Sequence, residues 1–368
     1  MYIGIDLGTS GVKTILTDES GKVVDSASSS LTVAIPQPLW SEQNPEDWWT
    51  ATCATLDELK QRNDLSVVKA LGLAGQMHGA TLLDKVGQVL RPAILWNDGR
   101  SEAQCRTLES TIIKARVITG NLVMPGFTAP KLLWIKENEP DIFKQVDKVL
   151  LPKDYLRYKL TGEFASDMSD SAGTSWLNTG ERSWSKSMLM ACGLSEKHMP
   201  TLYEGNEITG YLTAKTAKRW GMKAVPVVAG AGDNAAGAVG CGIVDAGQAM
   251  LSLGTSGVYF AVTNDYRSDP ESAVHSFCHA VGHRWHLMSV MLSAASCLDW
   301  FAKNSGYSSV AELFDDVVNN TRPDDPNTPF FLPYLTGERT PHNNPNAKAG
   351  FFGLTASTTR AHMAQAVV

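Results

Sequence analysis

Leu7-Gly8-Thr9-Ser10-Gly11-Val12 is the stretch that decides the fold, because the same six residues return as Leu253-Gly254-Thr255-Ser256-Gly257-Val258. In each copy an apolar run leads into the turn and a β-rich run leaves it. Each copy therefore predicts a strand, a glycine-bearing turn and a second strand. Six identical residues can arise by chance, but the matching patterns on both sides favour a duplicated domain.

The repeated Gly-Thr-Ser-Gly turn suits a phosphate group. Its glycines let backbone N–H groups converge without a Cβ in the way, and its hydroxyls add donors at the same point. A plain hairpin turn also prefers glycine and serine, and one copy alone would favour that explanation. Two copies favour two phosphate loops that face each other across a cleft: Gly8, Thr9, Ser10 and Gly11 in the first, and Gly254, Thr255 and Ser256 in the second.

Length and composition exclude several classes of protein. A chain of 368 residues is too long for one ordinary core and predicts two domains. With 32 basic and 38 acidic side chains the net charge is −6, which argues against a generally basic nucleic-acid binder. No apolar run reaches the roughly 18–20 residues that span a bilayer. There is no basic, apolar leader at the N-terminus, and the six cysteines lie far apart without a CxxC pair, so we expect a reduced, cytoplasmic protein.

Strand and helix patterns alternate between the two copies. Asn44-Pro45-Glu46-Asp47 is a strong helix start, and Trp49, Cys53, Leu56 and Leu59 follow at helical spacing as a buried stripe. We expect the neighbouring Trp48 in the core as well. Apolar runs at 67–74 and 225–230 predict buried strands, and the domain boundary falls near 242–247. The sequence therefore predicts an α/β protein.

Two carboxylates stand where α/β proteins build their sites. Asp6 ends the first strand just before the first turn, where it could hold Mg²⁺ through water or simply cap the turn. Asp233 follows an apolar strand and is surrounded by glycines at 230, 232 and 237. Small neighbours would let a substrate approach this carboxylate, which suits a general base. An N-cap of a helix is the alternative for Asp233.

Other polar residues also follow strands. His78 lies between two glycines, and a substrate contact and a core histidine fit it equally well. Trp96-Asn97-Asp98-Gly99-Arg100 offers an aromatic face with donors and acceptors that suit a polyhydroxylated ligand. The histidines between 275 and 286 do not have zinc-ligand spacing, and the alternation at 272–280 and 285–290 predicts a hairpin.

Several motifs together resemble a known family. The opening Ile-Asp-Leu-Gly-Thr-Ser and the duplication resemble the superfamily of sugar kinases, actin and heat-shock chaperones. Within it, the chain resembles the FGGY carbohydrate kinases, and among these the members that act on D-xylulose. The resemblance rests on residues 76–79, 96–100, 126–138, 232–235 and 333–342. It implies duplicated actin-like ATPase (ribonuclease H-like) domains.

The same resemblance implies an activity and a site. The γ-phosphate of ATP would pass to the terminal hydroxyl of D-xylulose, giving D-xylulose 5-phosphate, with Asp233 accepting the hydroxyl proton. Asp6 and Asp233 would hold Mg²⁺, partly through water. The sugar would lie among Met77, His78, Trp96, Asp233 and Asn234. Phosphates would bind the two turns and Lys13.

The C-terminus departs from the family pattern. FGGY kinases carry a longer second domain with a Gly-Gly adenosine motif well downstream, and nothing here matches it. Residues 349–363 resemble the second family signature, and the chain stops at Val368. We therefore expect a sugar-binding domain at residues 1–245 and the first part of a nucleotide-binding domain at 246–368, with the second domain and its adenosine pocket incomplete.

Three alternatives stay open at this stage. One is a truncated sugar-binding remnant with impaired catalysis, and another is a kinase for a different ketopentose such as ribulose. The third is a chaperone or cytoskeletal ATPase, against which the sugar-site motifs argue. The residues leave the oligomeric state open, a homodimer among the options.

Overall fold

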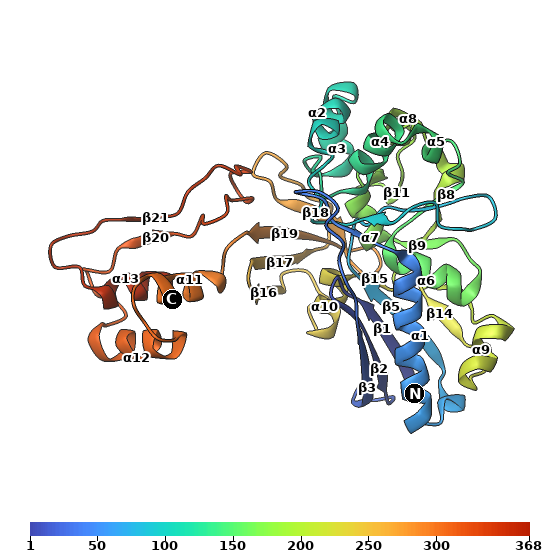
Figure 1. The fold of residues 1–368 in the computed structure, drawn as a ribbon, viewed down its shortest axis with the longest axis horizontal. Coiled ribbons are helices and arrows are strands. Elements are labelled where there is room, and N and C mark those ends of the chain that lie inside the picture. Colours follow the sequence, from blue (N-terminus) through green and yellow to red (C-terminus); the bar gives the residue numbers. More distant parts are fainter. The chain divides into compact units, whose positions relative to one another are not determined.

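The computed structural model describes residues 1–368 and divides into two compact units. The N-terminal unit comprises Met1–Ala246, Val262–Ser268 and Ser276–His286. The C-terminal unit comprises Gly247–Ala261, Asp269–His275 and Leu287–Val368. The chain therefore leaves the N-terminal unit after Ala246 and contributes two more short segments to it. Figure 1 labels the elements along the chain.

A mixed sheet organises the N-terminal unit. Its strand order is β13-β14-β5-β1-β2-β3, and β15 also pairs with β5. Strand β2 runs antiparallel to its neighbours β1 and β3. Strand β5 runs parallel to β1, and β14 and β15 run parallel to β5. The carboxyl ends of β1, β5 and β15 therefore meet at one edge. The strands are β1 Tyr2–Leu7, β2 Gly11–Thr17, β3 Val23–Ser30, β5 Ala70–Gly75, β13 Ile208–Tyr211, β14 Pro226–Val228 and β15 Ala231–Gly232.

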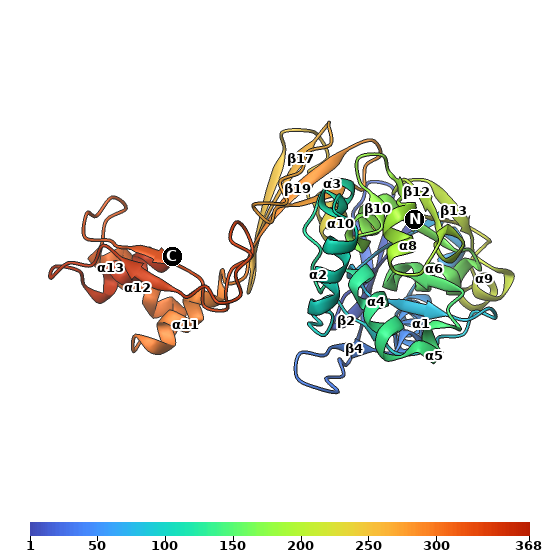
Figure 2. The same cartoon turned by 90° about the horizontal axis from the view of Figure 1, so that it is seen from above.

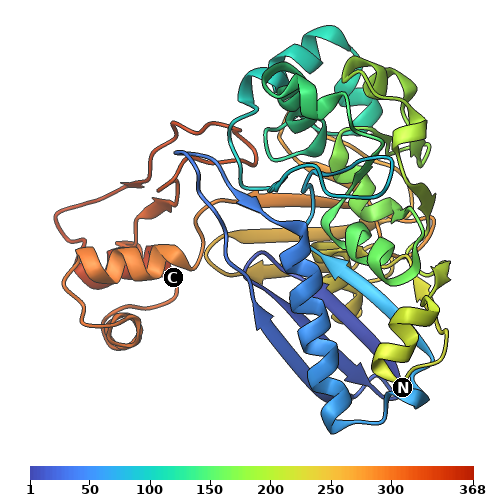
Figure 3. The same ribbon diagram turned by 45° about the vertical axis from the view of Figure 1, so that its right-hand side comes forward.

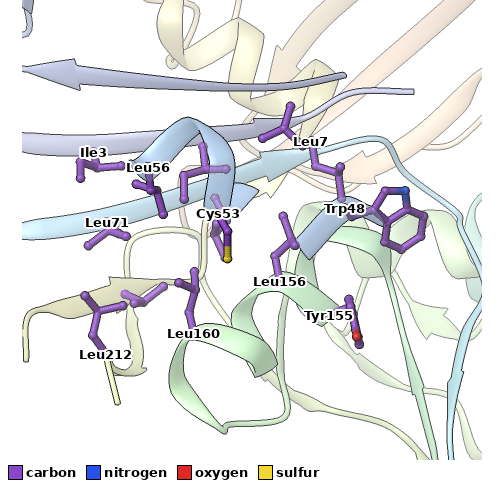
Figure 4. Close-up of a cluster of buried hydrophobic side chains, with 14 of the residues drawn as sticks. Ile3, Leu7, Trp48, Cys53, Leu56, Leu71, Tyr155, Leu156, Leu160 and Leu212 are labelled. Atoms are coloured by element: carbon purple, nitrogen blue, oxygen red, sulfur yellow. The ribbon is translucent and has the colours of Figure 1, made fainter. Parts of the chain in front are cut away.

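Helix α1, Pro45–Arg62, packs on this sheet together with α6, Pro152–Thr161, and α9, Ala214–Trp220 (Figure 3). It begins as predicted, because the Asn44 side chain accepts the N–H of Glu46 at 3.2 Å. Figure 4 shows leucines of the helices and strands meeting in the core between them. The buried stripe of α1 differs from the predicted one at its first position, which Trp48 occupies in place of Trp49. Trp48 is fully buried, whereas Trp49 is only partly covered at the edge of this core.

A second core of the N-terminal unit lies around α4, Thr128–Asn138, which contacts α2 and α5. The elements not yet named in this unit are mostly short. They are β4 Glu42–Gln43, β6 Thr81–Leu83, β7 Ala93–Ile94, β8 Lys148–Leu150, β9 Ala165–Asp167, β10 Leu177–Asn178, β11 Ser183–Trp184, β12 Thr201–Tyr203, α2 Glu102–Thr111, α3 Ala115–Thr119, α5 Pro140–Phe143, α7 Met168–Ser171, α8 Lys186–Ala191 and α10 Asp233–Gly240.

The second half of the chain begins with the second copy of the repeat. Strands β16, Ala249–Leu253, and β17, Gly257–Thr263, pair antiparallel. They belong to a sheet of order β16-β17-β19-β18, where β18 is His275–Cys278 and β19 is Trp285–Met291, so the predicted hairpin is confirmed. The C-terminal unit continues with three mutually contacting helices, visible in Figure 2, and a small two-stranded sheet. These are α11 Ser296–Asn304, α12 Val310–Asn320, α13 Arg360–Val367, β20 Phe330–Leu332 and β21 Gly350–Phe352.

Both copies of the repeat form strand, turn and strand, as predicted, but their turns close differently. In the first copy Leu7 pairs with Val12 and the N–H of Gly8 donates to Gly11 O at 2.9 Å. In the second copy Leu253 pairs with Gly257 and the N–H of Gly254 donates to Ser256 O at 3.0 Å. The second turn is one residue tighter, so the same six residues do not present the same backbone groups.

Two further properties concern the chain as a whole. None of its helices combines the length and the apolar character needed to cross a bilayer. The cysteines form no disulfide. Five of them are buried, as expected for core residues, while Cys241 is exposed just after α10.

Candidate active site

Asp6 lies near the carboxyl end of β1 with Lys13 of β2 directly opposite in the antiparallel register. Partial burial raises the pKa of the Asp6 carboxyl above its ordinary value, and the positive charge of Lys13 opposes that shift. The alternation of the two strands places both side chains on the same face of the sheet. Asp6 therefore lies beside one basic side chain, Lys13, near the sheet edge.

Asp233 is the first residue of α10, directly after β15. Gly232 occupies the N-cap position, so the N-cap role considered for Asp233 is not what the structure shows. Its Oδ1 accepts the backbone N–H of Asn234 at 2.7 Å and that residue's side-chain amide at 2.9 Å. Although the side chain remains accessible to solvent, desolvation by surrounding protein raises its pKa to about 6. The negative charge of Asp6 adds to this rise.

Of the three glycines around Asp233, Gly237 has open space around it, whereas Gly230 and Gly232 do not leave the room for substrate that we expected of them. Gly230 has φ +72°, and a Cβ there would lie 1.8 Å from the Leu73 carbonyl oxygen. A Cβ on Gly232 would lie 2.9 Å from Sδ of Met77, which is buried. At these two positions the glycines let β15 approach β5 and Met77, so the space is filled by the protein itself.

His78 lies in a tight turn after β5. Its φ is +69°, and the N–H of Gly79 donates to Met77 O at 2.9 Å across it. The ring Nδ1 bonds to Gly173 O at 2.7 Å, and the ring centroid lies 4.7 Å from that of Phe127. A Cβ on Gly173 would lie 2.3 Å from this ring. His78 is therefore a half-buried ring held in one orientation.

Trp96 is linked to the first repeated turn by a hydrogen-bond chain that sequence reasoning missed. Its indole N–H donates to Oγ1 of Thr9 at 2.9 Å, and that hydroxyl donates to Oε1 of Gln76 at 3.2 Å. The Gln76 amide donates to Gln43, whose own amide donates to Thr9 O at 2.7 Å. The Gln76-Met77-His78-Gly79 motif was the one available signal for this network. The Thr9 hydroxyl is thus engaged with Trp96 and Gln76.

The rest of the pentapeptide after Trp96 turns inward. Asp98 accepts the N–H of Ser41 at 2.6 Å and a bidentate contact from Arg100. Arg100 also pairs with Glu42 at 2.7 Å and stacks on the Trp40 ring at 3.6 Å. The expectation that the whole motif serves a ligand is therefore wrong for these two residues, because their charges satisfy each other inside the protein. Trp96 and Asn97 remain exposed.

The second repeated turn, in the C-terminal unit, is anchored to the start of α11. Gly254 O accepts the N–H of Ala295 at 2.9 Å. Thr255 O accepts the N–H of Ala294 at 2.9 Å and the hydroxyl of Ser296 at 2.8 Å. The carbonyl groups of Gly254 and Thr255 are thereby committed to the protein, and the Gly254 N–H is used within the turn, so the Thr255 and Ser256 hydroxyls are the groups that could face a ligand.

A cavity of about 680 Å³ opens beside Asp6 in the N-terminal unit. Its lining comes from β1, β2, β5 and α10 and is largely apolar, and Asp6 and Lys13 are its charged residues. No group of three or more His, Cys, Asp or Glu side chains is placed to bind a metal ion. A metal at this edge would depend on Asp6 and Asp233 alone among the carboxylates.

Comparison with known proteins identifies the family. The model for the "FGGY family of carbohydrate kinases, N-terminal domain" matches residues 1–240, and that for the C-terminal domain of the same family matches residues 249–368. The chain belongs to the FGGY family of carbohydrate kinases. The actin-like, ribonuclease H-like α/β fold expected from the resemblance is confirmed.

Relatives of this FGGY kinase are similar over its whole length. Xylulose kinases of Escherichia coli K12 and Klebsiella pneumoniae are 64% and 62% identical to it, and the alignments cover all of this chain and 76% of each relative. The crystal structure of a xyloylose kinase from Brucella ovis superposes with a TM-score of 0.95 at 51% identity, and covers all of this chain and 75% of that one.

Near β15, the strand that directly precedes Asp233, this kinase has a buried ionic cluster that we did not predict. Lys153 Nζ contacts carboxylate oxygens of Asp154 at 2.7 Å, Asp167 at 2.5 Å and Asp170 at 3.2 Å, all fully buried. Burial raises the pKa of Asp170 well above its ordinary value. Arg157 extends the cluster to the carbonyl groups of Val228 and Ala229. Its charged members all lie between residues 153 and 170, but charged side chains are usually exposed, so nothing in the sequence indicated that these are buried.

Proposed function

We propose that this kinase transfers the γ-phosphate of ATP to the terminal hydroxyl of D-xylulose, giving D-xylulose 5-phosphate. The observation that carries the proposal is Asp233, a carboxylate at the sheet edge with a pKa of about 6. Identities of 64% and 62% to curated xylulose kinases support D-xylulose over other sugars. The same identities argue against a sugar-binding remnant and against a chaperone or cytoskeletal ATPase.

Asp233 acts in this proposal as the general base. A carboxylate with a pKa near 6 is ionised at neutral pH, yet it is basic enough to take a proton from a hydroxyl that attacks phosphorus. Phosphoryl transfer is largely dissociative, so positioning and charge neutralisation carry much of the barrier reduction. The two Asn234 donors hold one carboxylate oxygen in place. The base is thereby oriented before the substrate arrives.

The sugar lies, in the same proposal, against side chains at the ends of β5, β7 and β15. Met77 supplies a buried apolar surface, His78 a ring held by Gly173, and Trp96 an exposed aromatic face. Asn234 supplies an amide beside the base. An aromatic face with a few placed polar groups is the usual composition of a site for a polyhydroxylated ligand.

Mg²⁺ fits the two carboxylates of the sheet edge. The two negative charges repel each other, since Asp6 raises the pKa of Asp233. A divalent cation between them would relieve that repulsion. Mg²⁺ commonly takes one or two carboxylates and fills its other positions with water and substrate phosphates. When bound, it would neutralise phosphate charge during transfer.

The phosphate contacts complete the proposal. Thr9, Ser10, Gly11 and Lys13 would contact phosphates from the first turn, and Thr255 and Ser256 from the second, while the N–H groups of Gly8 and Gly254 are already used within their turns. Residues 1–245 would then form the sugar-binding domain and residues 246–368 the first part of the nucleotide-binding domain. A homodimer and a cytoplasmic location belong to the same proposal, and sedimentation velocity and cell fractionation test them.

A coupled assay of ADP release tests the function directly. Turnover that depends on D-xylulose is expected, with D-ribulose as the competing substrate. Asp233→Asn should lower kcat by about 10²–10⁴-fold while D-xylulose binding stays measurable by calorimetry. Asp47→Asn, an exposed acid in the first turn of α1, is the control. Near-wild-type turnover of Asp233→Asn would refute the base, and hydrolysis that ignores sugar would identify an ATPase.

A further inference from the structure

Lys131 has a fully buried amine, and the packing of the core does not explain why a lysine stands at this position. It lies on α4 with no solvent exposure, and its Nζ forms no ion pair with a carboxylate. Burial lowers its pKa well below the ordinary value. Burying a lysine amine that is bonded to no carboxylate is unfavourable, even with the negative charge of Asp98 nearby, and a methionine would fill the same space without that cost. The residue is therefore expected to do something that an apolar side chain could not.

The first contact of Lys131 is with the turn at His78. Its Nζ donates to His78 O at 2.9 Å, and the Thr128 hydroxyl donates to the same oxygen at 3.2 Å. His78 has φ +69° inside a three-residue turn closed by the N–H of Gly79, a conformation that is strained for any residue with a Cβ. Such a turn persists only when its surroundings hold it. Lys131 and Thr128 provide two of the bonds that do so.

The second contact of Lys131 leads to Trp96. The same Nζ donates to Gly126 O at 2.7 Å. Gly126 packs directly on the backbone of Trp96, since a Cβ at Gly126 would lie 2.5 Å from the Trp96 carbonyl oxygen. The single amine of Lys131 therefore joins the backbone of His78 to the backbone that packs on Trp96.

We propose that Lys131 is the positioning residue of the sugar site, holding the turns of His78 and Trp96 in register with each other. The proposal rests on the proposed function, because it takes these two side chains as sugar contacts. Lys131 itself does not touch the sugar. It acts through two carbonyl oxygens, and its loss leaves the nucleotide contacts untouched.

Steady-state kinetics of Lys131→Met test this role, with Lys136→Met as the matched control. Lys136 lies on the same helix, in its exposed last turn. For Lys131→Met we expect the KM for D-xylulose to rise about tenfold or more and the KM for ATP to stay within about twofold. Calorimetry with D-xylulose alone should show the same weakening. Thr128→Val removes the second donor to His78 O without changing shape, and should raise the sugar KM by a smaller factor.

Specific results would overturn the proposal. One is a D-xylulose KM within about twofold of wild type in folded Lys131→Met. Another is an equal rise in both KM values that follows a lowered thermal midpoint, which a purely structural role would give. If Lys131→Met does not fold, an unchanged sugar KM in Thr128→Val decides against it. His78→Ala separates the two levels. An unchanged sugar KM there refutes the proposed sugar site, whereas a raised one with normal Lys131→Met refutes the positioning role alone.

Discussion

Single residues carry the proposed chemistry, and Asp6 and Asp233, two carboxylates at one edge of the sheet, are the ones on which it depends. Asp6 and Asp233 could be placed because polar residues after apolar strands collect at one sheet edge. Gly230 and Gly232 were misinterpreted, since their neighbours Leu73 and Met77 are distant in sequence. Lys131 was missed for a similar reason. Its acceptors are backbone carbonyl oxygens, and a carbonyl leaves no trace in the residue type that bears it.

The pKa of Asp233 predicts how catalysis depends on pH. A general base must be ionised, so kcat/KM should fall below a pKa of about 6, by about tenfold per pH unit. A pH series of initial rates with D-xylulose measures this limb. The limb should be absent from the residual activity of Asp233→Asn. A profile that stays flat well below pH 6 would contradict the assignment.

The same pKa predicts how folding stability depends on pH. The folded-state pKa of about 6 lies above the ordinary 3.8, so ionising Asp233 is harder in the folded protein than in the unfolded chain. Stability is therefore lost as pH rises from about 4 to about 6. Asp233→Asn should raise the thermal midpoint above pH 7 and leave it unchanged below pH 4. An unchanged midpoint at pH 8 would show that ionisation of Asp233 does not destabilise the folded protein.

Elements are predictable where a local signal decides them. Helix α1 begins at Pro45, as predicted, because the signal is local: the Asn44 side chain caps the helix and Pro45 is its first residue. The strand expected at 67–74 instead begins at Ala70, since Asp64 accepts the N–H of Ser66 and caps a short 3₁₀ turn at Leu65–Val67. The ionic cluster of the consecutive elements α6, β9 and α7 could not be predicted, because charged residues at these positions give no local sign that they are fully buried together.

This cluster should be a major contributor to the stability of the elements behind Asp233. Arg157 is fully buried and donates to Thr209 Oγ1 and to the carbonyls of Val228 and Ala229. Arg157→Met should lower the free energy of unfolding by about 3–5 kcal/mol, because it leaves buried acceptors and Asp154 without this partner. Lys159→Met, on the same helix but partly exposed, should cost less than about 1 kcal/mol. Urea unfolding compares them, and equal losses would contradict the argument.

At the scale of the whole molecule, the duplication could be found from sequence but the path of the chain could not. The repeat identified two copies of one strand–turn–strand unit, and both formed. Nothing in the sequence indicated that Val262–Ser268 and Ser276–His286 belong to the N-terminal unit. Their place depends on long-range contacts. The Asn121 side chain bonds to the backbone of Ser276 at 2.9 and 3.0 Å, and the Phe277 ring lies 6.3 Å from that of His78.

Val262–Ser268 and Ser276–His286 return to the N-terminal unit after the chain has left it at Ala246. We therefore predict that truncating the chain after residue 246 destabilises this unit more than truncating it further along. A chain ending at residue 246 lacks Ser276 and Phe277, so Asn121 loses its partner and the His78 ring loses a neighbour. A chain ending at 291, after β19, keeps both. We expect the shorter fragment to have the lower thermal midpoint and the weaker D-xylulose affinity, because the sugar site draws its support from beyond residue 246. Calorimetry on the two fragments measures both quantities, and equal affinity would place the whole support of the site within residues 1–246.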